Sequence, residues 1–206
     1  MNHKVNSVAE LYASALALNN NVVVGASETS AATIMKNLKE GIEVLKNSWQ
    51  GMDAGTQINN VVTVYNAMVR VKNLLAGLSV ETSKIASDYR AIQRANGAQL
   101  EDLAPIIECA PDALMGEYSD TRDTVSITPD AVNGKARIDA ANNAMDGFIS
   151  EIRRYFNEIM ENWMQGPKRD EANQAFEEFI AGSSKYKELL NEVSQSIATA
   201  LQNYGM

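Results

Sequence analysis

The side chains that carry catalysis or bind metals are few in this sequence and lie far apart. His3 is the only histidine and Cys109 is the only cysteine. Their separation along the chain excludes most nucleophilic triads and most metal sites built from histidine and cysteine. Acidic residues form close pairs at Glu101-Asp102, Asp120/Asp123 and Glu177-Glu178. Such pairs on helix surfaces or turns are usually solvated, and they become catalytic only where a pocket shifts their pKa values.

Composition points away from enzymes and towards protein partners. No glycine-rich phosphate-binding loop is present, so the sequence predicts no enzyme, no cofactor and no metal site. The 206 residues carry a formal net charge of −8, which disfavours nucleic acid and anionic lipid as partners. No apolar run approaches the roughly 20 residues of a membrane span. Cys109 cannot form an intrachain disulfide, and we expect it to be a buried or half-buried small hydrophobe.

Two apolar stripes meet at Trp49-Gln50-Gly51. Apolar residues precede Trp49 in helical steps of three or four, at Leu45, Ile42, Leu38 and Ile34. A second stripe follows from Ile58 onwards, so the spacing predicts helices over residues 27–48 and from Asp53 to about Asn96, with an interruption or kink at residues 77–79. Ser27, Thr29 or Ser30 can cap the first helix. We expect a positive φ at Gly51 and a capping role for Asp53, in a corner that makes the helices antiparallel.

The same corner recurs at Trp163-Met164-Gln165-Gly166 with one extra residue. Apolar residues stand four, seven and eleven positions before each tryptophan, which for the second are Ile159, Phe156 and Ile152. Pro167 suits the first position of a following helix, predicted to reach about Tyr204 with an interruption at residues 182–184. We interpret the pattern as a duplicated helical hairpin. The alternative is that a tryptophan before a glycine marks two ordinary helix ends.

Residues outside the hairpins have their own patterns. Val8, Leu11, Tyr12 and Ala15 share one helical face, which predicts a short amphipathic helix over residues 6–18. Glu10 and Tyr12 interrupt the apolar region, so we expect no cleaved signal peptide. We expect a mobile tail at His3, a break at residues 19–21 and extended chain at residues 22–24. Residues 98–128 should form short helical turns over the bundle, with residues 125–127 extended. Thr128-Pro129-Asp130 predicts a helix start, with Thr128 as the capping hydroxyl. The predicted units are residues 1–26, 27–97, 98–128 and 129–206.

Two helices joined by a Trp-x-Gly turn resemble the WXG family of small, early-secreted-antigen-like substrates of bacterial type VII secretion. Trp49 and Gly51 match the motif, whereas Trp163 and Gly166 depart from it by one insertion. The resemblance covers about residues 28–96 and 130–205. Family members are usually single hairpins that pair into an antiparallel four-helix bundle, and this chain resembles two of them fused.

The resemblance implies an all-α protein whose two hairpins form a four-helix bundle and whose tryptophans lie at opposite ends. It also implies a non-enzymatic protein, made in the bacterial cytoplasm and secreted without a cleaved signal peptide. Its partners would be a secreted effector or the secretion machinery, and the chain would be a monomeric pseudo-dimer or a homodimer. The tryptophans would cover the bundle ends, present partly exposed anchors, or serve only as core aromatics. No tyrosine heads the Tyr-x-x-x-Asp/Glu export motif of some relatives.

A different class of protein fits the same long hairpins. A structural or assembly protein, such as a phage or surface-array component, would use them to oligomerise, with stripes wider than one bundle can bury. The predicted helices carry methionines that are compatible with such an assembly protein, at Met35, Met68, Met145 and Met160.

Overall fold

The computed structural model describes residues 4–120, 122 and 124–205, so the predicted mobile tail at His3 and the acidic side chain of Asp123 lie outside the described residues. The chain is mostly helical, which confirms the all-α class. Its α-helices are α1 (Val8–Ala17), α2 (Ala31–Ser48), α3 (Met52–Ala95), α4 (Ala131–Asn162) and α5 (Pro167–Asn203). A π-helix, η1, spans Leu18–Val23. The short strands are β1 (Lys4–Val5), β2 (Trp49–Gln50), β3 (Ser126–Ile127) and β4 (Trp163–Gln165).

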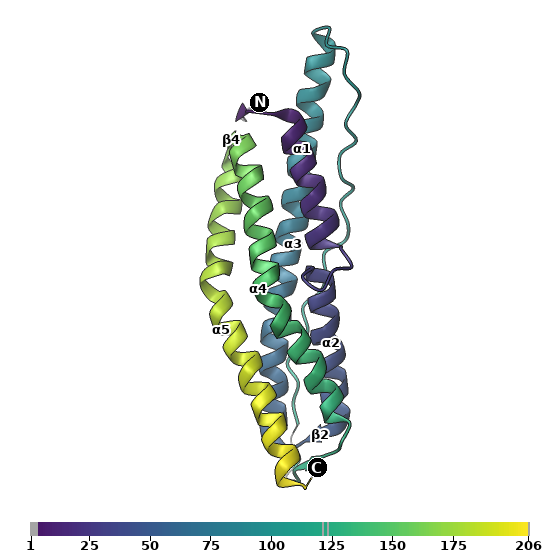
Figure 1. Ribbon diagram of the computed structural model, residues 1–206, viewed down its shortest axis with the longest axis vertical. Coiled ribbons are helices and arrows are strands. Elements are labelled where there is room, and N and C mark those ends of the chain that lie inside the picture. Colours follow the sequence, from purple (N-terminus) through teal and green to yellow (C-terminus); the bar gives the residue numbers. More distant parts are fainter. Residues whose placement is uncertain (1–3, 121, 123, 206) are drawn as a thin grey trace.

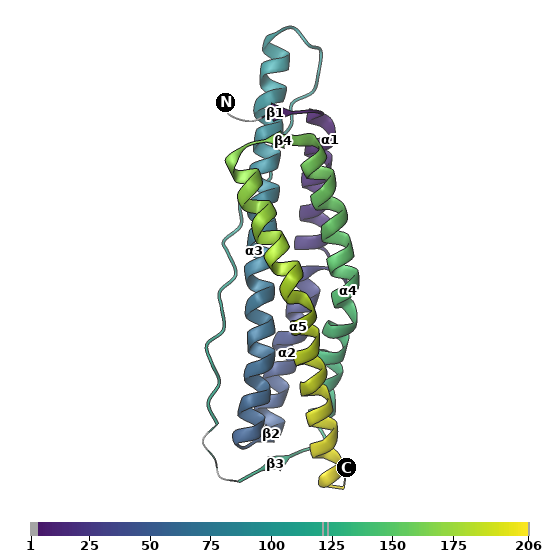
Figure 2. The same ribbon diagram turned by 90° about the vertical axis from the view of Figure 1, so that its left-hand side faces the viewer.

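The helices lie lengthwise against each other in a long bundle (Figure 1). Helices α1, η1 and α2 follow one another down one side, and α3 returns along the full length. An extended segment then runs back beside α3, after which α4 ascends and α5 descends (Figure 2). Helix α2 packs on α4, α3 packs on α5, and α1 packs on both α3 and α4. None of the described helices is both long and apolar enough to cross a membrane.

Local signals place most of the helix starts. Ser30 is the residue that caps α2, because its hydroxyl accepts from the Thr33 N–H at 3.2 Å. Pro167 opens α5, as predicted. Two predicted caps are wrong: Asp53 lies inside the first turn of α3 without capping it, and Thr128 lies before α4 while its backbone oxygen, not its hydroxyl, accepts from the Ala131 N–H.

The predicted interruptions are wrong. Helices α3 and α5 run unbroken through Gly77 and Gly182. A glycine inside a helix costs only about 1 kcal/mol, and burial of stripe residues such as Leu75 and Leu78 offsets that. Residues 18–23 are also helical and not broken or extended, because the wider π-helical turn buries Val22 and Val23 in the core.

The segment after α3 differs most from its prediction. Residues 98–125 contain no helix among the residues described, although β3 confirms an extended chain at Ser126 and Ile127. The backbone carbonyls of Asp112, Met115 and Tyr118 accept from side chains of α3 and not from helical turns of their own.

One continuous core lies between the helices. Glycine allows α2 and α4 to approach closely at Gly41, where an added Cβ would lie 3.1 Å from Ile138 Cγ1 and 3.3 Å from the Gly134 oxygen. The largest fully buried side chains include Leu11, Leu18, Ile34, Leu38, Ile42, Leu45, Ile58, Met68, Leu75, Ile138, Phe148 and Trp163. The core therefore includes side chains from both hairpins.

Candidate functional site at the two tryptophan corners

The first corner is a tight turn between α2 and α3. Trp49 and Gln50 form β2, which pairs antiparallel with Ile127 and Ser126 of β3. The Trp49 side chain is buried, at 3% exposure. Gly51 follows with φ +112° and ψ 169°, a conformation that other residues rarely adopt. The predicted positive φ is confirmed, and this corner requires glycine.

An acidic side chain from the extended segment closes the first corner. The Gly51 N–H donates to Asp120 Oδ2 at 3.0 Å. Arg122 donates to both oxygens of the same carboxylate, from Nη2 at 2.7 Å and from Nε at 2.8 Å. The hydrogen bonds from Arg122, and then that from Gly51, hold the pKa of Asp120 far below its ordinary value. This carboxylate takes the place predicted for Asp53, and its side chain is only 1% exposed.

The second corner has the same parts. Trp163 to Gln165 form β4, which pairs antiparallel with Val5 and Lys4 of β1. The Trp163 side chain is fully buried, and its indole N–H donates to the Gln165 oxygen at 3.2 Å. Arg169 Nε donates to the Trp163 oxygen at 2.7 Å. The extra residue of this corner lies within the longer strand, and Gly166 again has a positive φ, +155°.

The two corners are closed reciprocally. Strand β3, which covers the first corner, leads into α4, the first helix of the second hairpin. Strand β1, which covers the second corner, leads into α1, which precedes α2, the first helix of the first hairpin. The corners lie at opposite ends of the bundle, as predicted (Figure 1). Each half therefore runs from a covering strand through a first helical part, a Trp-Gly corner and a returning helix, although the first helical part is divided into α1, η1 and α2 in the first half and is the single helix α4 in the second.

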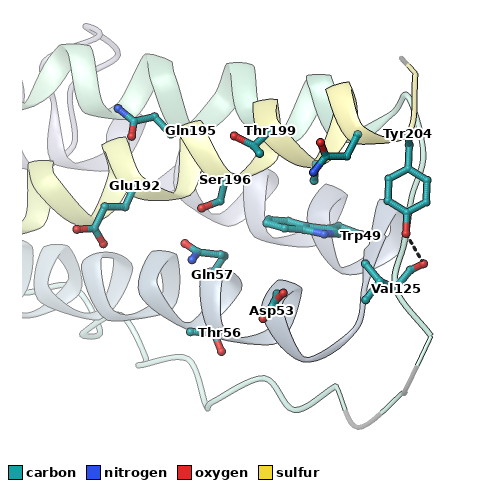
Figure 3. Close-up of a pocket in the computed structure, with 12 residues that line it drawn as sticks. Trp49, Asp53, Thr56, Gln57, Val125, Glu192, Gln195, Ser196, Thr199 and Tyr204 are labelled. Carbon is teal, nitrogen blue, oxygen red and sulfur yellow. Dashed lines mark hydrogen bonds between the residues drawn. The ribbon is translucent and has the colours of Figure 1, made fainter.

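A cleft lies between α3 and α5 beside each corner. The first has a volume of about 720 Å³, and Figure 3 shows the Trp49 indole between α5 and the start of α3. Thr56 and Gln57 line it, five and six residues after Gly51. The second cleft, of about 420 Å³, is lined by Trp163 and by Glu171 and Ala172, five and six residues after Gly166. The two clefts occupy equivalent positions in the two hairpins.

The structure places the candidate catalytic and metal-binding side chains of the described residues. No group of three or more histidine, cysteine, aspartate or glutamate residues within the described part of the chain could hold a metal ion. Glu101-Asp102 and Glu177-Glu178 are exposed, and Asp102 pairs with Arg94 while Glu178 accepts from Gln174. Cys109 is exposed, so its predicted burial is wrong. The reason is that it lies on the extended segment outside the bundle and not on a helical turn.

Burial of the indoles also decides between the expectations for the tryptophans. At 3% and 0% exposure, neither Trp49 nor Trp163 is a partly exposed anchor, and both belong to the core at the bundle ends. The surface at the first corner is formed by neighbours instead, with Met52 at 70% exposure, Val125 at 49% and Tyr204 at 48%. Tyr204 donates its hydroxyl to the Val125 oxygen at 2.8 Å (Figure 3).

Two groups of residues escaped the sequence analysis. Asp120 was predicted only as a member of a solvated acidic pair, which is wrong because its side chain is buried against Gly51 and Arg122. No local spacing ties Asp120 or Arg122 to a turn far away in the chain. Asn59, Asn66 and Asn73 did give a signal, since they recur every seven residues along one face of α3. Their side chains bind the backbone of the extended segment.

Comparison with known proteins adds no identification. No protein-family model, no curated protein and no solved structure matches this chain. Membership of the WXG family therefore stays a prediction from the corners.

Proposed function

We propose that this chain is a tandem WXG-type protein that acts by helix–helix binding, as a substrate of a bacterial type VII secretion system or as a chaperone-like partner that escorts a helical effector. The reciprocal closure of the two corners is the observation that supports the proposal most. Each Trp-Gly turn is covered by the strand that precedes the other hairpin. Two paired hairpins would have this arrangement if they were joined into one chain.

The packing supports a monomer that contains its own pseudo-dimer. A single amphipathic hairpin exposes an apolar stripe, which a second hairpin must cover. Here α4 covers α2 and α5 covers α3, and the stripe residues Leu38, Ile42 and Ile138 are fully buried. Fusion supplies the second hairpin at a high effective concentration. The four-helix pseudo-dimer would therefore form without a second chain.

Partner binding would use the bundle ends and not the buried stripes. The first corner combines a cleft of about 720 Å³ with exposed apolar side chains at Met52, Val125 and Tyr204. Trp49, Val125, Ala200 and Tyr204 form the apolar part of the cleft's lining, and the remaining lining residues, such as Gln57 and Glu192, are polar. A surface of this kind suits an amphipathic helix of a partner. We infer that the buried Trp49 side chain packs under this surface and keeps its shape, while the exposed Met52 side chain contacts the partner.

Secretion tests the proposal. A tagged chain is followed in the medium and lysate of a type VII-competent bacterium, in the parent strain and in a strain without the secretion ATPase, with a cytoplasmic enzyme as the lysis control. We expect ATPase-dependent export, which Met52→Gln reduces without changing the melting temperature. Val132→Gln, at an exposed valine on α4, is the matched control and should be exported normally. A chain that never leaves the cell, or that leaves without the ATPase, contradicts the proposal.

A further inference from the structure

The extended segment between the hairpins follows α3 along most of its length. We call residues 101–120 the strap. It runs antiparallel to α3 on the outside of the bundle, as a thin trace beside the helix (Figure 2). Its side chains are half-buried at every third position through most of its length, at Leu103, Ile106, Asp112, Met115 and Tyr118. A period of three is that of polyproline II, the conformation of many extended peptide ligands.

Three asparagines of α3 hold the strap by its backbone. Each donates from its side-chain amide to a strap carbonyl and accepts from the N–H of the same strap residue, at distances from 2.8 to 3.1 Å. The rungs pair Asn59 with Tyr118, Asn66 with Met115 and Asn73 with Asp112. We call these three asparagines the ladder. Because the ladder contacts only backbone atoms of the strap, it does not depend on the strap's side chains.

The spacing of the ladder suits an extended chain. Seven helical residues advance about 10.5 Å, and three extended residues advance about 9–10 Å. Further along α3, two serines four residues apart also bind the strap: Ser83 accepts from the Ile106 N–H at 2.8 Å, and Ser87 donates to the Leu103 oxygen at 2.7 Å. The strap is therefore held at regular intervals by the three asparagines, in the manner of a bound peptide, and at two further points by the serines.

Charge distinguishes the strap from the helix below it. The strap has six acidic residues and no lysine or arginine, at Glu101, Asp102, Glu108, Asp112, Glu117 and Asp120. Residues 70–94 of α3 carry five basic residues and two acidic ones, although the whole chain has a net charge of −8. Lys72 pairs with Asp112 at 2.6 Å, and Arg94 pairs with Asp102. This face of α3 thus favours an acidic extended ligand.

One position in the middle is held less well. Val80 stands seven residues after Asn73 and has no amide with which to form the next rung. Cys109 of the strap lies there, exposed, beside a cavity of about 130 Å³. Ile107 nearby is 86% exposed. The strap can begin to detach here without exposing the core of the bundle.

We propose that the ladder face of α3 is a binding site for an extended acidic segment of a partner protein, and that the strap is its resident ligand, which the partner displaces. The site recognises the peptide backbone, acidic charge, and apolar side chains at most of the positions three residues apart. Exchange of one extended segment for another replaces each ladder bond by an equivalent one. The strap is present at an effective concentration of the order of millimolar, so a partner must bind tightly or act when the strap is loosened.

Two neighbouring proline variants test the exchange. Met115→Pro removes the N–H that donates to Asn66, whereas Leu114→Pro removes no N–H of a rung and is the matched control. The probe is a fluorescein-labelled peptide with the sequence of residues 101–120, titrated against the full chain by fluorescence anisotropy. We expect Met115→Pro to bind it at least tenfold more tightly than the wild type and Leu114→Pro do. Replacing Asn59, Asn66 and Asn73 by alanine in the Met115→Pro chain should remove that gain.

Two further measurements test the proposal: binding of a peptide with reversed charge, and hydrogen–deuterium exchange of the wild-type chain. A peptide with lysine at all six acidic positions should not bind the Met115→Pro chain. In the wild type, the amides of Asp112, Met115 and Tyr118 should exchange hydrogen for deuterium at least tenfold faster than the amides of buried α3 residues. Equal peptide binding with and without the ladder, or strap amides that exchange only with global unfolding, would overturn the proposal. A Met115→Pro chain that dimerises through exchanged straps would assign the site to a second copy and overturn the assignment to a partner.

Discussion

Replacement of Gly51 by alanine tests the geometry of the first corner. Gly51 has φ +112° and ψ 169°, and an added Cβ would lie 3.1 Å from Val125 Cγ2 and 3.4 Å from the Thr124 oxygen. Both the backbone conformation and the space oppose a side chain. The strained backbone alone costs about 1–3 kcal/mol. We therefore expect Gly51→Ala to lower the free energy of unfolding by about 2 kcal/mol, and by more if Val125 cannot move aside.

A glycine inside α3, the helix that follows Gly51, provides the control. An added Cβ at Gly77 meets no atom within 4 Å, and the residue lies inside α3 with helical neighbours. Gly77→Ala should therefore stabilise the chain by about 0.5–1 kcal/mol through the lower backbone entropy of its unfolded state. The same chemical change is thus expected to have opposite effects at the two sites.

Thermal unfolding followed by circular dichroism at 222 nm measures both effects. For a chain of this length, about 1 kcal/mol moves the melting temperature by about 2–4 °C. Gly51→Ala should melt about 4–8 °C below the wild type, and Gly77→Ala about 1–4 °C above it. If Gly51→Ala melts within about 1 °C of the wild type while Gly77→Ala is stabilised, the reasoning about the corner is wrong.

Three further expectations concern the ion pair, the thiol and the helix contact. The folded chain holds the pKa of Asp120 below its unfolded value, so the stabilisation by this carboxylate is present above about pH 4 and is lost as the pH falls; between pH 7 and pH 3, the melting temperature of Asp120→Asn should fall less than that of the wild type. Cys109 is exposed, so a maleimide should label the native chain stoichiometrically, and labelling only in denaturant would refute its placement. Gly41→Val should destabilise the chain by about 1–3 kcal/mol in urea unfolding, because its Cβ would lie 3.1 Å from Ile138 Cγ1, whereas Gly116→Val, with no atom within 4 Å, should have little effect.

The long helices were predictable because burial imposes a period on the sequence. Ile34, Leu38, Ile42 and Leu45 recur in steps of three or four, and all four are fully buried. The positive φ at Gly51 was predictable for a similar reason, since few residues other than glycine adopt it. Glycine inside a helix gave a misleading signal: Gly77 and Gly182 weaken a helix locally, but burial of the stripe on both sides keeps α3 and α5 intact.

The parts that could not be predicted depend on contacts between distant residues. Asp120 closes a turn at Gly51, and β1 and β4 lie almost the whole chain apart. The strap was predicted as helical turns because Leu103, Ile106 and Met115 are apolar, and apolar residues three apart fit a helix as well as an extended chain of period three. The asparagines of α3 decide between the two, and their spacing of seven was the signal to follow.

The pairing between α3 and the strap limits how the strap can shift along the helix. A shift by one or two residues would move the half-buried positions away from α3, so only steps of three keep both the faces and the rungs. From one rung to the next, the helix advances about 0.5–1 Å further than the strap. This mismatch accumulates along α3 and therefore favours a ladder of few rungs. The ends at Gly51 and Arg94, where Asp120 and Asp102 are held, fix which step is used. Deleting three residues of the strap should therefore shift its register by one rung, whereas deleting one should release it from the ladder.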